Sequence, residues 1–95
     1  MADKSGAETS GEREEVLLTA RLTLPDAARR LYLVRNISAG GACLNHRGEL
    51  AQGARIKASI GRLDEVDAVI VWVGPERAGL RFTDPIDVAL AKAAA

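Results

Sequence analysis

Apolar and polar residues alternate along most of this 95-residue chain. The first such run has an apolar residue at every second position: Val16, Leu18, Ala20, Leu22 and Leu24. A period of two predicts a β-strand with one buried face. Pro25 and Asp26 follow it, and this pair is typical of a turn.

Five further strands are predicted on the same grounds, at residues 30–37, 42–44, 55–60, 66–73 and 79–83. In the second strand, Leu31, Leu33 and Ile37 alternate with Tyr32, Val34 and Asn36. In the last two, Trp72 and Phe82 fall on apolar faces, so we expect both in the core. The Gly40-Gly41 pair predicts a tight reversal, because glycine adopts positive φ at little cost.

A short helix is expected at the C-terminal end of the chain. Asp84 is a candidate N-cap and Pro85 a candidate first helical residue. Six short strands separated by turns are typical of a sandwich or barrel, and closure removes the exposed sheet edges. We therefore predict an all-β fold: a small six-stranded antiparallel β-barrel with a short C-terminal helix. Residues 13–95 form this single domain, and residues 1–12 are expected to be a flexible tail.

The formal net charge of zero conceals a segregation along the chain. Residues 16–62 hold eight Lys and Arg but only two Asp and Glu, whereas the segments on either side are acidic. Such a basic middle segment favours an anionic ligand, although solvated strand faces that avoid aggregation explain the same pattern.

Composition argues against several classes of protein. One cysteine forms no internal disulfide, no apolar run is long enough to span a membrane, and no secretory signal is evident, so a cytoplasmic location is expected. Cys43 and His46 are the only thiol and imidazole, and their spacing on a strand separates them. We predict no enzyme, no metal site and no cofactor. Three aromatic residues are too few for a DNA- or RNA-binding surface.

One polar segment carries candidate binding chemistry: Arg35, Asn36, Ile37, Ser38, Ala39, Gly40 and Gly41. An amide offers donors and an acceptor to a nucleobase, a hydroxyl donates to phosphate, and glycine N–H groups approach an anion closely. An ordinary turn, in which Asn36 and Ser38 bond to their own backbone, explains the same residues.

This segment resembles the (D/N)xSxxG motif of PilZ domains, with Asn36, Ser38 and Gly41 at its fixed positions. Other features recur there in the same order: Gly53 before a strand, the tryptophan strand 69–73, and the GLRF run at 79–82. The resemblance covers about residues 13–90. It implies a six-stranded barrel that binds the second messenger cyclic di-GMP through Arg35, Asn36, Ser38, Gly40 and Gly41, and that signals to an effector protein.

PilZ domains also carry an RxxxR motif before the first strand, whose arginines clamp guanine edges and phosphates. Arg13 matches the second arginine of that motif, but Thr9 stands where the first would be. Lys4 or Arg35 offers a partial replacement for the missing charge, although lysine lacks the planar fork of arginine. Two functions remain open: a cyclic di-GMP sensor, and a protein-interaction adaptor of the same fold that has lost nucleotide binding.

Overall fold

A computed structural model describes residues 14–93 of the chain. Its strands are β1 (Glu14–Thr23), β2 (Arg29–Ile37), β3 (Gly41–Asn45), β4 (Arg55–Ile60), β5 (Leu63–Val73) and β6 (Arg77–Phe82). The predicted flexible tail, and with it Arg13, lies outside the described residues. All six expected strands are present, and β5 and β6 begin earlier than their alternation suggests.

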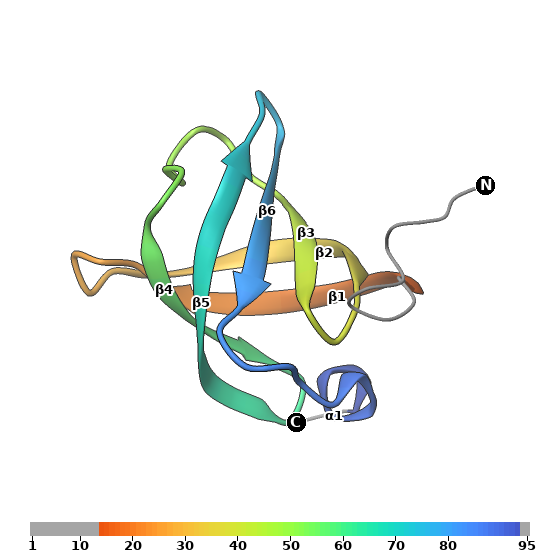
Figure 1. The fold of residues 1–95 in the computed structure, drawn as a ribbon. Coiled ribbons are helices and arrows are strands. Elements are labelled where there is room, and N and C mark those ends of the chain that lie inside the picture. Colours follow the sequence, from red (N-terminus) through yellow and green to blue (C-terminus); the bar gives the residue numbers. More distant parts are fainter. Residues whose placement is uncertain (1–13, 94–95) are drawn as a thin grey trace.

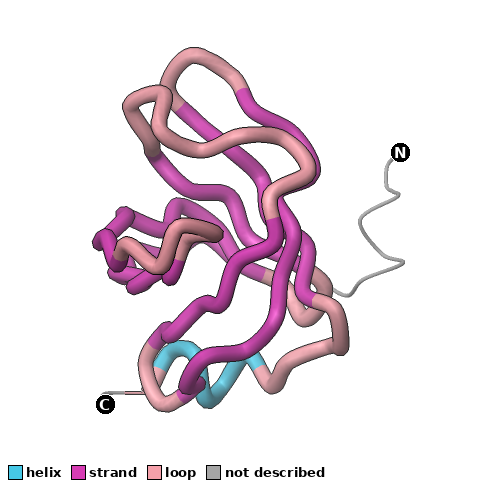
Figure 2. Tube along the Cα trace, turned by 90° about the vertical axis from the view of Figure 1, so that its left-hand side faces the viewer, coloured by secondary structure: helices cyan, strands magenta, loops and turns pink. Residues whose placement is uncertain are grey.

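The strands form a closed antiparallel barrel in the order β1-β2-β3-β6-β5-β4. The β1–β2 ribbon runs across the direction of β5 and β6 (Figures 1 and 2). Closure is local, because β4 pairs only with residues 20–23 of β1, whereas β2 pairs with β1 from Glu14 to Thr23. The predicted all-β barrel is therefore confirmed.

The barrel interior is filled by side chains from every strand. The largest fully buried ones are Leu22, Val34, Ser38, Ile37, Leu44, Ile60 and Ile70. The alternation of β1 and β4 predicted their inward faces correctly, because Ala20, Ile56 and Ala58 are also buried. Phe82 lies in the core as expected.

Strand β2 turns its leucines outward. Tyr32 and Val34 are buried, whereas Leu31 and Leu33 are 70% and 38% exposed. The register shifts between Val34 and Asn36, and such a bulge changes which alternate positions face the core. Ile37 consequently returns to the interior, so Leu31, Leu33 and Ile37 do not share one face.

The C-terminal helix begins later than the sequence suggested. Helix α1 spans Val88–Lys92, and its N-cap is Asp87, whose carboxylate accepts the Ala89 N–H at 2.9 Å. The prediction of Asp84 as N-cap and Pro85 as first helical residue is wrong. The helix lies at the end of the barrel opposite the β5–β6 turn (Figure 1) and inserts the fully buried Ala91.

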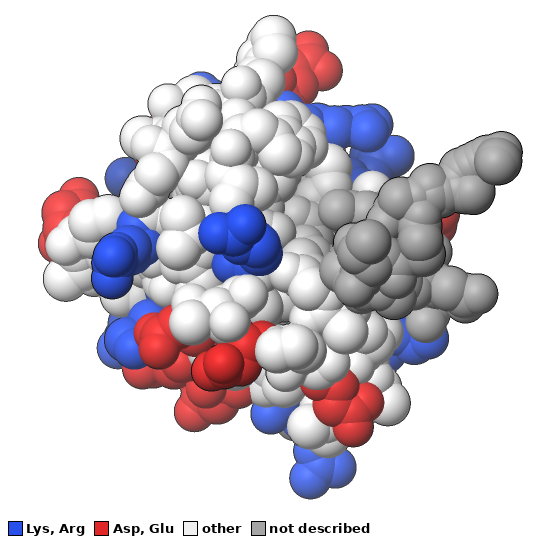
Figure 3. Space-filling model, viewed as in Figure 1, with Lys and Arg blue, Asp and Glu red and all other residues white. Residues whose placement is uncertain are grey.

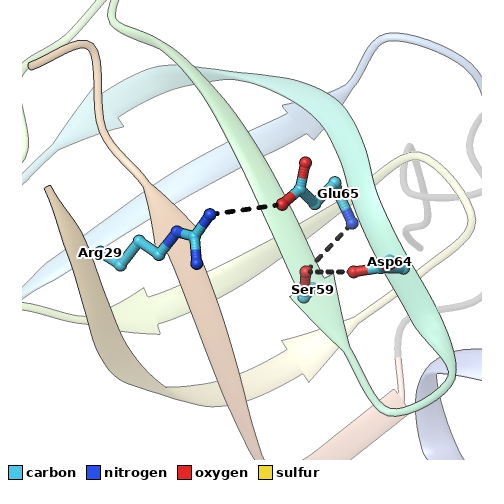
Figure 4. A network of polar contacts seen from close by, with 4 residues as sticks. All are labelled: Arg29, Ser59, Asp64 and Glu65. Atoms are coloured by element: carbon cyan, nitrogen blue, oxygen red, sulfur yellow. Dashed lines mark hydrogen bonds and ion pairs between the residues drawn. The ribbon is translucent and has the colours of Figure 1, made fainter. Parts of the chain in front are cut away.

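A polar network fixes the corner between β4 and β5 (Figure 4). The Ser59 hydroxyl donates to Asp64 at 3.2 Å and accepts the Glu65 N–H at 3.0 Å. Glu65 has a positive φ of 52°, and its carboxylate lies 4.0 Å from the Arg29 guanidinium on β2. These contacts stabilise the bulge that lets β5 start at Leu63 instead of Val66.

Candidate ligand-binding site

The turn between β2 and β3 is organised by Ser38. Its N–H donates to the Gly41 carbonyl at 2.8 Å, and its hydroxyl oxygen accepts the Gly40 N–H at 3.3 Å. Ser38 is fully buried. The hydroxyl is therefore engaged within the turn, as the ordinary-turn interpretation expects for Ser38, and it presents no atom to solvent.

Two backbone hydrogen bonds tie this turn to the chain that follows β6. The Phe82 N–H donates to the Gly40 carbonyl at 2.9 Å, and the Ile86 N–H donates to the Ala39 carbonyl at 2.9 Å. The turn is consequently held on one side by the end of β6 and on the other by the segment that leads into α1.

Glycine is required at position 41 because a side chain would not fit there, and not because the backbone has a positive φ. The described glycines with positive φ are Gly48, Gly53 and Gly61, so the expectation of positive φ at the Gly40-Gly41 reversal is wrong. A Cβ atom on Gly41 would overlap the carbonyl oxygen of Leu80 on the neighbouring strand. The third fixed position of the motif thus allows β3 to approach β6 closely.

A surface hollow of about 700 Å³ opens beside the turn, over the outer side of β3, β6 and β5. Its lining comprises Asn36, Gly40, Gly41, Ala42, Cys43, Val71, Trp72, Gly79, Leu80, Arg81, Phe82, Thr83 and Pro85. Among residues 14–93, Arg81 is the only charged residue in this lining. The hollow therefore combines apolar walls with one guanidinium, and its volume is in the range of small-molecule sites.

Trp72 lies on this surface and not in the core. Its side chain is 44% exposed, because the register of β5 against β6 shifts between Ile70 and Trp72 and so moves the indole to the outer side. The expectation of a core tryptophan is wrong. The indole lies against Gly79, where any Cβ atom would overlap the ring.

The start of β1 meets the motif. Glu14 pairs with Ile37, and Glu15 pairs with Asn36. The first residues of β1 therefore lie beside Asn36 on β2, whereas Arg13 itself lies outside the described residues.

Arg35 faces a different part of the surface. It is half-buried and lines a second hollow of about 650 Å³, together with Arg47, Arg77, Glu49 and other residues of β2, β3 and the β5–β6 turn. The structure therefore brings Asn36, Gly40 and Gly41 together around one hollow, keeps Ser38 beneath it, and places Arg35 beside the other.

Charge is distributed unevenly over the face that contains β5 and β6 (Figure 3). A cationic group lies near the centre of this view, and carboxylates gather directly below it. Four carboxylates, from Glu65, Asp67, Asp84 and Asp87, line another hollow near the segment before α1. Thr83 and Pro85 line both hollows, so an anion at the first hollow meets Arg81 and has this acidic group at its border.

Cys43 and His46 do not form a reactive pair. Cys43 is a buried free cysteine in β3. His46 follows that strand; its Nε2 lies 2.7 Å from the Gly74 carbonyl and its Nδ1 accepts the Gly48 N–H at 3.1 Å. Within residues 14–93, no group of three His, Cys, Asp or Glu residues is placed to hold a metal ion.

Arg81, Trp72 and Thr83 were absent from the site that the sequence predicted. Arg81 alternates with Leu80 and Phe82 in the GLRF run, which predicts an outward side chain, but the run does not indicate which residues lie beside it. The three residues line the same hollow as Asn36 because β3 pairs with β6 and β6 pairs with β5. No local sequence pattern predicts this strand order.

The PilZ domain family model matches residues 9–94 of the chain. The chain belongs to the PilZ domain family. This is a family of cyclic di-GMP-binding adaptor domains and not of enzymes, and the six-stranded barrel with one short helix agrees with its fold. A search of curated proteins found no match to the chain. The described helix is too short to cross a membrane.

Proposed function

We propose that this PilZ domain binds cyclic di-GMP in the hollow beside the β2–β3 turn and passes the signal to a partner protein in the cytoplasm. The observation that carries the proposal is the convergence of Asn36, Gly40 and Gly41 with Trp72 and Arg81 around one hollow, whose lining within residues 14–93 contains no carboxylate. Residues of the (D/N)xSxxG motif, which suggested cyclic di-GMP as the ligand, therefore line the hollow that suits this ligand.

Three of the lining side chains offer contacts that suit a purine dinucleotide. The exposed Trp72 indole offers a stacking platform, an interaction worth about 1–3 kcal/mol per base. The Arg81 guanidinium suits a phosphate or the O6 and N7 edge of guanine, which it contacts through two parallel N–H groups. Asn36 offers its amide to the base edge.

Ser38 and Arg35 act less directly in this proposal. The buried Ser38 hydroxyl holds the Gly40 N–H, so it sets the shape of the turn that the ligand meets. Arg35 lines the other hollow and contributes through its positive charge. Arg13 enters from the chain before β1, where Glu14 is paired with Ile37.

Thr9 sets the expected affinity. It takes the place of an arginine in the RxxxR motif, and a lost hydrogen bond to a charged group costs about 1.5–3 kcal/mol. That energy corresponds to an affinity about 10- to 150-fold lower. The same residue favours the alternative function, a protein-interaction adaptor that has lost nucleotide binding.

Titration calorimetry of the full chain with cyclic di-GMP distinguishes the two functions. For a site that would otherwise bind at about 1 μM, we expect a dissociation constant of tens to hundreds of micromolar. The affinity should fall as salt is added. Thr9→Arg should strengthen it, and Arg81→Ala and Arg13→Ala should each weaken it about tenfold or more. Arg55→Ala is the matched control, because Arg55 is exposed on β4 and lines none of these hollows.

The adaptor function is supported if neither the wild-type chain nor Thr9→Arg shows heat at millimolar ligand. Binding that survives Arg81→Ala and Trp72→Ala unchanged would instead remove the hollow from the proposal, even if cyclic di-GMP is bound.

A further inference from the structure

Strand β2 is open along part of one edge. It lies between β1 and β3 in the barrel, but its pairing with β3 begins only at Val34 and runs to Ile37. Residues 29–33 pair with β1 on their other side. Within residues 14–93 they have no strand beside them on the side of β3. The N–H and C=O groups of such an edge are a template for a further strand.

The second hollow, which Arg35 lines, lies beside this open edge. Leu31, Tyr32 and Leu33 line it from β2, and its other wall comes from the end of β3, the loop after β3 and the β5–β6 turn. Strand β3 ends at Asn45, one position beyond its last pair with β2. The two strands therefore part here, and the hollow of about 650 Å³ lies between β2 and the chain that follows β3.

Hydrogen bonds from His46 hold the wall opposite β2 in place. The His46 N–H donates to the Glu76 carbonyl at 2.9 Å. Its Nε2 lies 2.7 Å from the Gly74 carbonyl, and its Nδ1 accepts the Gly48 N–H at 3.1 Å. The loop after β3 and the β5–β6 turn are thus joined, so the hollow is already formed in the free chain.

The charge of the second hollow favours a carboxylate-rich partner. Arg35, Arg47 and Arg77 line it, and none of the three forms an ion pair with another described residue. Of the two carboxylates in the lining, that of Glu49 already accepts the Arg47 N–H at 2.9 Å, and Glu76 lies exposed on the turn. The guanidiniums therefore outnumber the carboxylates and are available to a partner.

Two leucines add an apolar surface to the same strand. Leu31 is 70% exposed and Leu33 38%, although the solvent side of an antiparallel strand usually carries polar residues. Apolar side chains opposite one another on neighbouring strands stabilise a sheet. A strand added beside β2 would gain such pairs.

We propose that an extended acidic segment of a partner protein binds in the second hollow by adding a strand to residues 29–33 of β2. In this mode of recognition, main-chain hydrogen bonds supply affinity and side-chain contacts supply specificity. The three guanidiniums select carboxylates in the segment, and the two leucines select apolar residues between them. The partner segment is therefore one in which acidic and apolar residues alternate.

The second hollow shares no lining residue with the hollow that contains Trp72 and Arg81. The inference rests on the proposed function only in that it locates the binding surface for the partner protein. A chain that binds cyclic di-GMP but no acidic segment overturns the inference and leaves the ligand in place. A chain that binds the segment but no cyclic di-GMP supports the inference and overturns the ligand.

Fluorescence anisotropy with a short labelled peptide, in which glutamate and valine alternate, tests the proposal on the full chain. A peptide with lysine in place of glutamate should bind at least about tenfold more weakly. The variant Arg47→Glu/Arg77→Glu should also weaken binding of the acidic peptide at least about tenfold. Both arginines are exposed, so the variant should fold. The control of equal charge is Arg55→Glu/Arg62→Glu, whose exposed residues line neither hollow; it should change binding less than about twofold.

Amide hydrogen exchange tests the added strand itself. N–H groups of residues 29–33 should become protected when the acidic peptide binds. A peptide that is N-methylated at alternate residues has fewer donors and should bind at least about tenfold more weakly. The proposal is overturned if exchange at residues 29–33 is unchanged in the complex, or if Arg47→Glu/Arg77→Glu binds as the wild type does. No binding at millimolar peptide overturns it too, as does a single-stranded RNA that displaces the peptide at equal concentration.

Discussion

Trp72 and Gly79 face each other on β5 and β6 as register partners, and the indole occupies the space that a side chain at position 79 would need. The absence of a Cβ atom lets the ring lie flat along the hollow. Gly79 thereby determines where the single tryptophan of this chain is presented.

Gly79→Ala should displace the indole and weaken cyclic di-GMP binding. The added methyl group overlaps the ring, and such overpacking costs about 1–3 kcal/mol. Denaturant unfolding and tryptophan fluorescence measure the two effects. Gly74→Ala is the control, since its Cβ would meet only ordinary contacts; equal losses in both variants would contradict the role given to Gly79.

Ser38→Ala and Asn36→Ala should separate turn structure from ligand contact. Ser38→Ala removes the acceptor of the Gly40 N–H, so we expect lower stability by about 0.5–1.5 kcal/mol together with weaker binding. Asn36→Ala should lower affinity, because it removes the amide offered to the base edge. Chemical denaturation and calorimetry on both variants check this, and it fails if Ser38→Ala leaves stability unchanged or Asn36→Ala leaves affinity unchanged.

Asp87→Ala should destabilise the protein, whereas Asp84→Ala should not. Asp87 caps α1 through the Ala89 N–H at 2.9 Å, and loss of an N-cap costs about 0.5–2 kcal/mol. The two aspartates are both exposed, so they form a matched pair. A larger fall in melting temperature for Asp84→Ala than for Asp87→Ala would contradict this assignment and support Asp84 as the N-cap, as the sequence predicted.

Tyr32 should make the fold sensitive to high pH. Burial, followed by the negative charge of Glu49, raises the pKa of Tyr32 to about 12, above the value of about 10 in an unfolded chain. The protonated hydroxyl is favoured in the folded state, so its contribution to stability is complete below about pH 10 and is lost as pH rises toward about 12.

Absorbance titration of this single tyrosine checks the midpoint, and denaturant unfolding across the same range checks the loss of stability. Tyr32→Phe should remove that pH-dependent part, and Glu49→Gln should lower the midpoint. Within residues 14–93 the buried Tyr32 hydroxyl has no partner at good hydrogen-bond geometry, and Glu49 interacts with it only weakly, so Tyr32→Phe should change stability at neutral pH by less than about 1 kcal/mol. A midpoint near 10 would contradict the prediction.

The alternation of residues was sufficient to predict the six strands and the closed barrel. It failed at Trp72, and it failed in grouping Ile37 on one face with Leu31 and Leu33, because the register shifts before Trp72 in β5 and between Val34 and Asn36 in β2. A single inserted residue reverses the facing of every side chain beyond it, and neither strand carries a glycine or proline there to mark the bulge.

The candidate site was predicted in part. The (D/N)xSxxG resemblance located Asn36 and Gly41 correctly at one end of β2 because these residues are contiguous in sequence. Arg81 and Trp72 join them only through the pairing of β3 with β6 and of β6 with β5. That order depends on how the whole barrel closes, so no local pattern indicates it.

The bonds from Phe82 to Gly40 and from Ile86 to Ala39 connect the motif to the C-terminal helix. Residues 39 and 40 cannot shift without either breaking two amide–carbonyl contacts or displacing the chain that enters α1. A rearrangement at the motif that keeps both bonds therefore moves the segment before the helix through the backbone itself, with no side chain needed as intermediary.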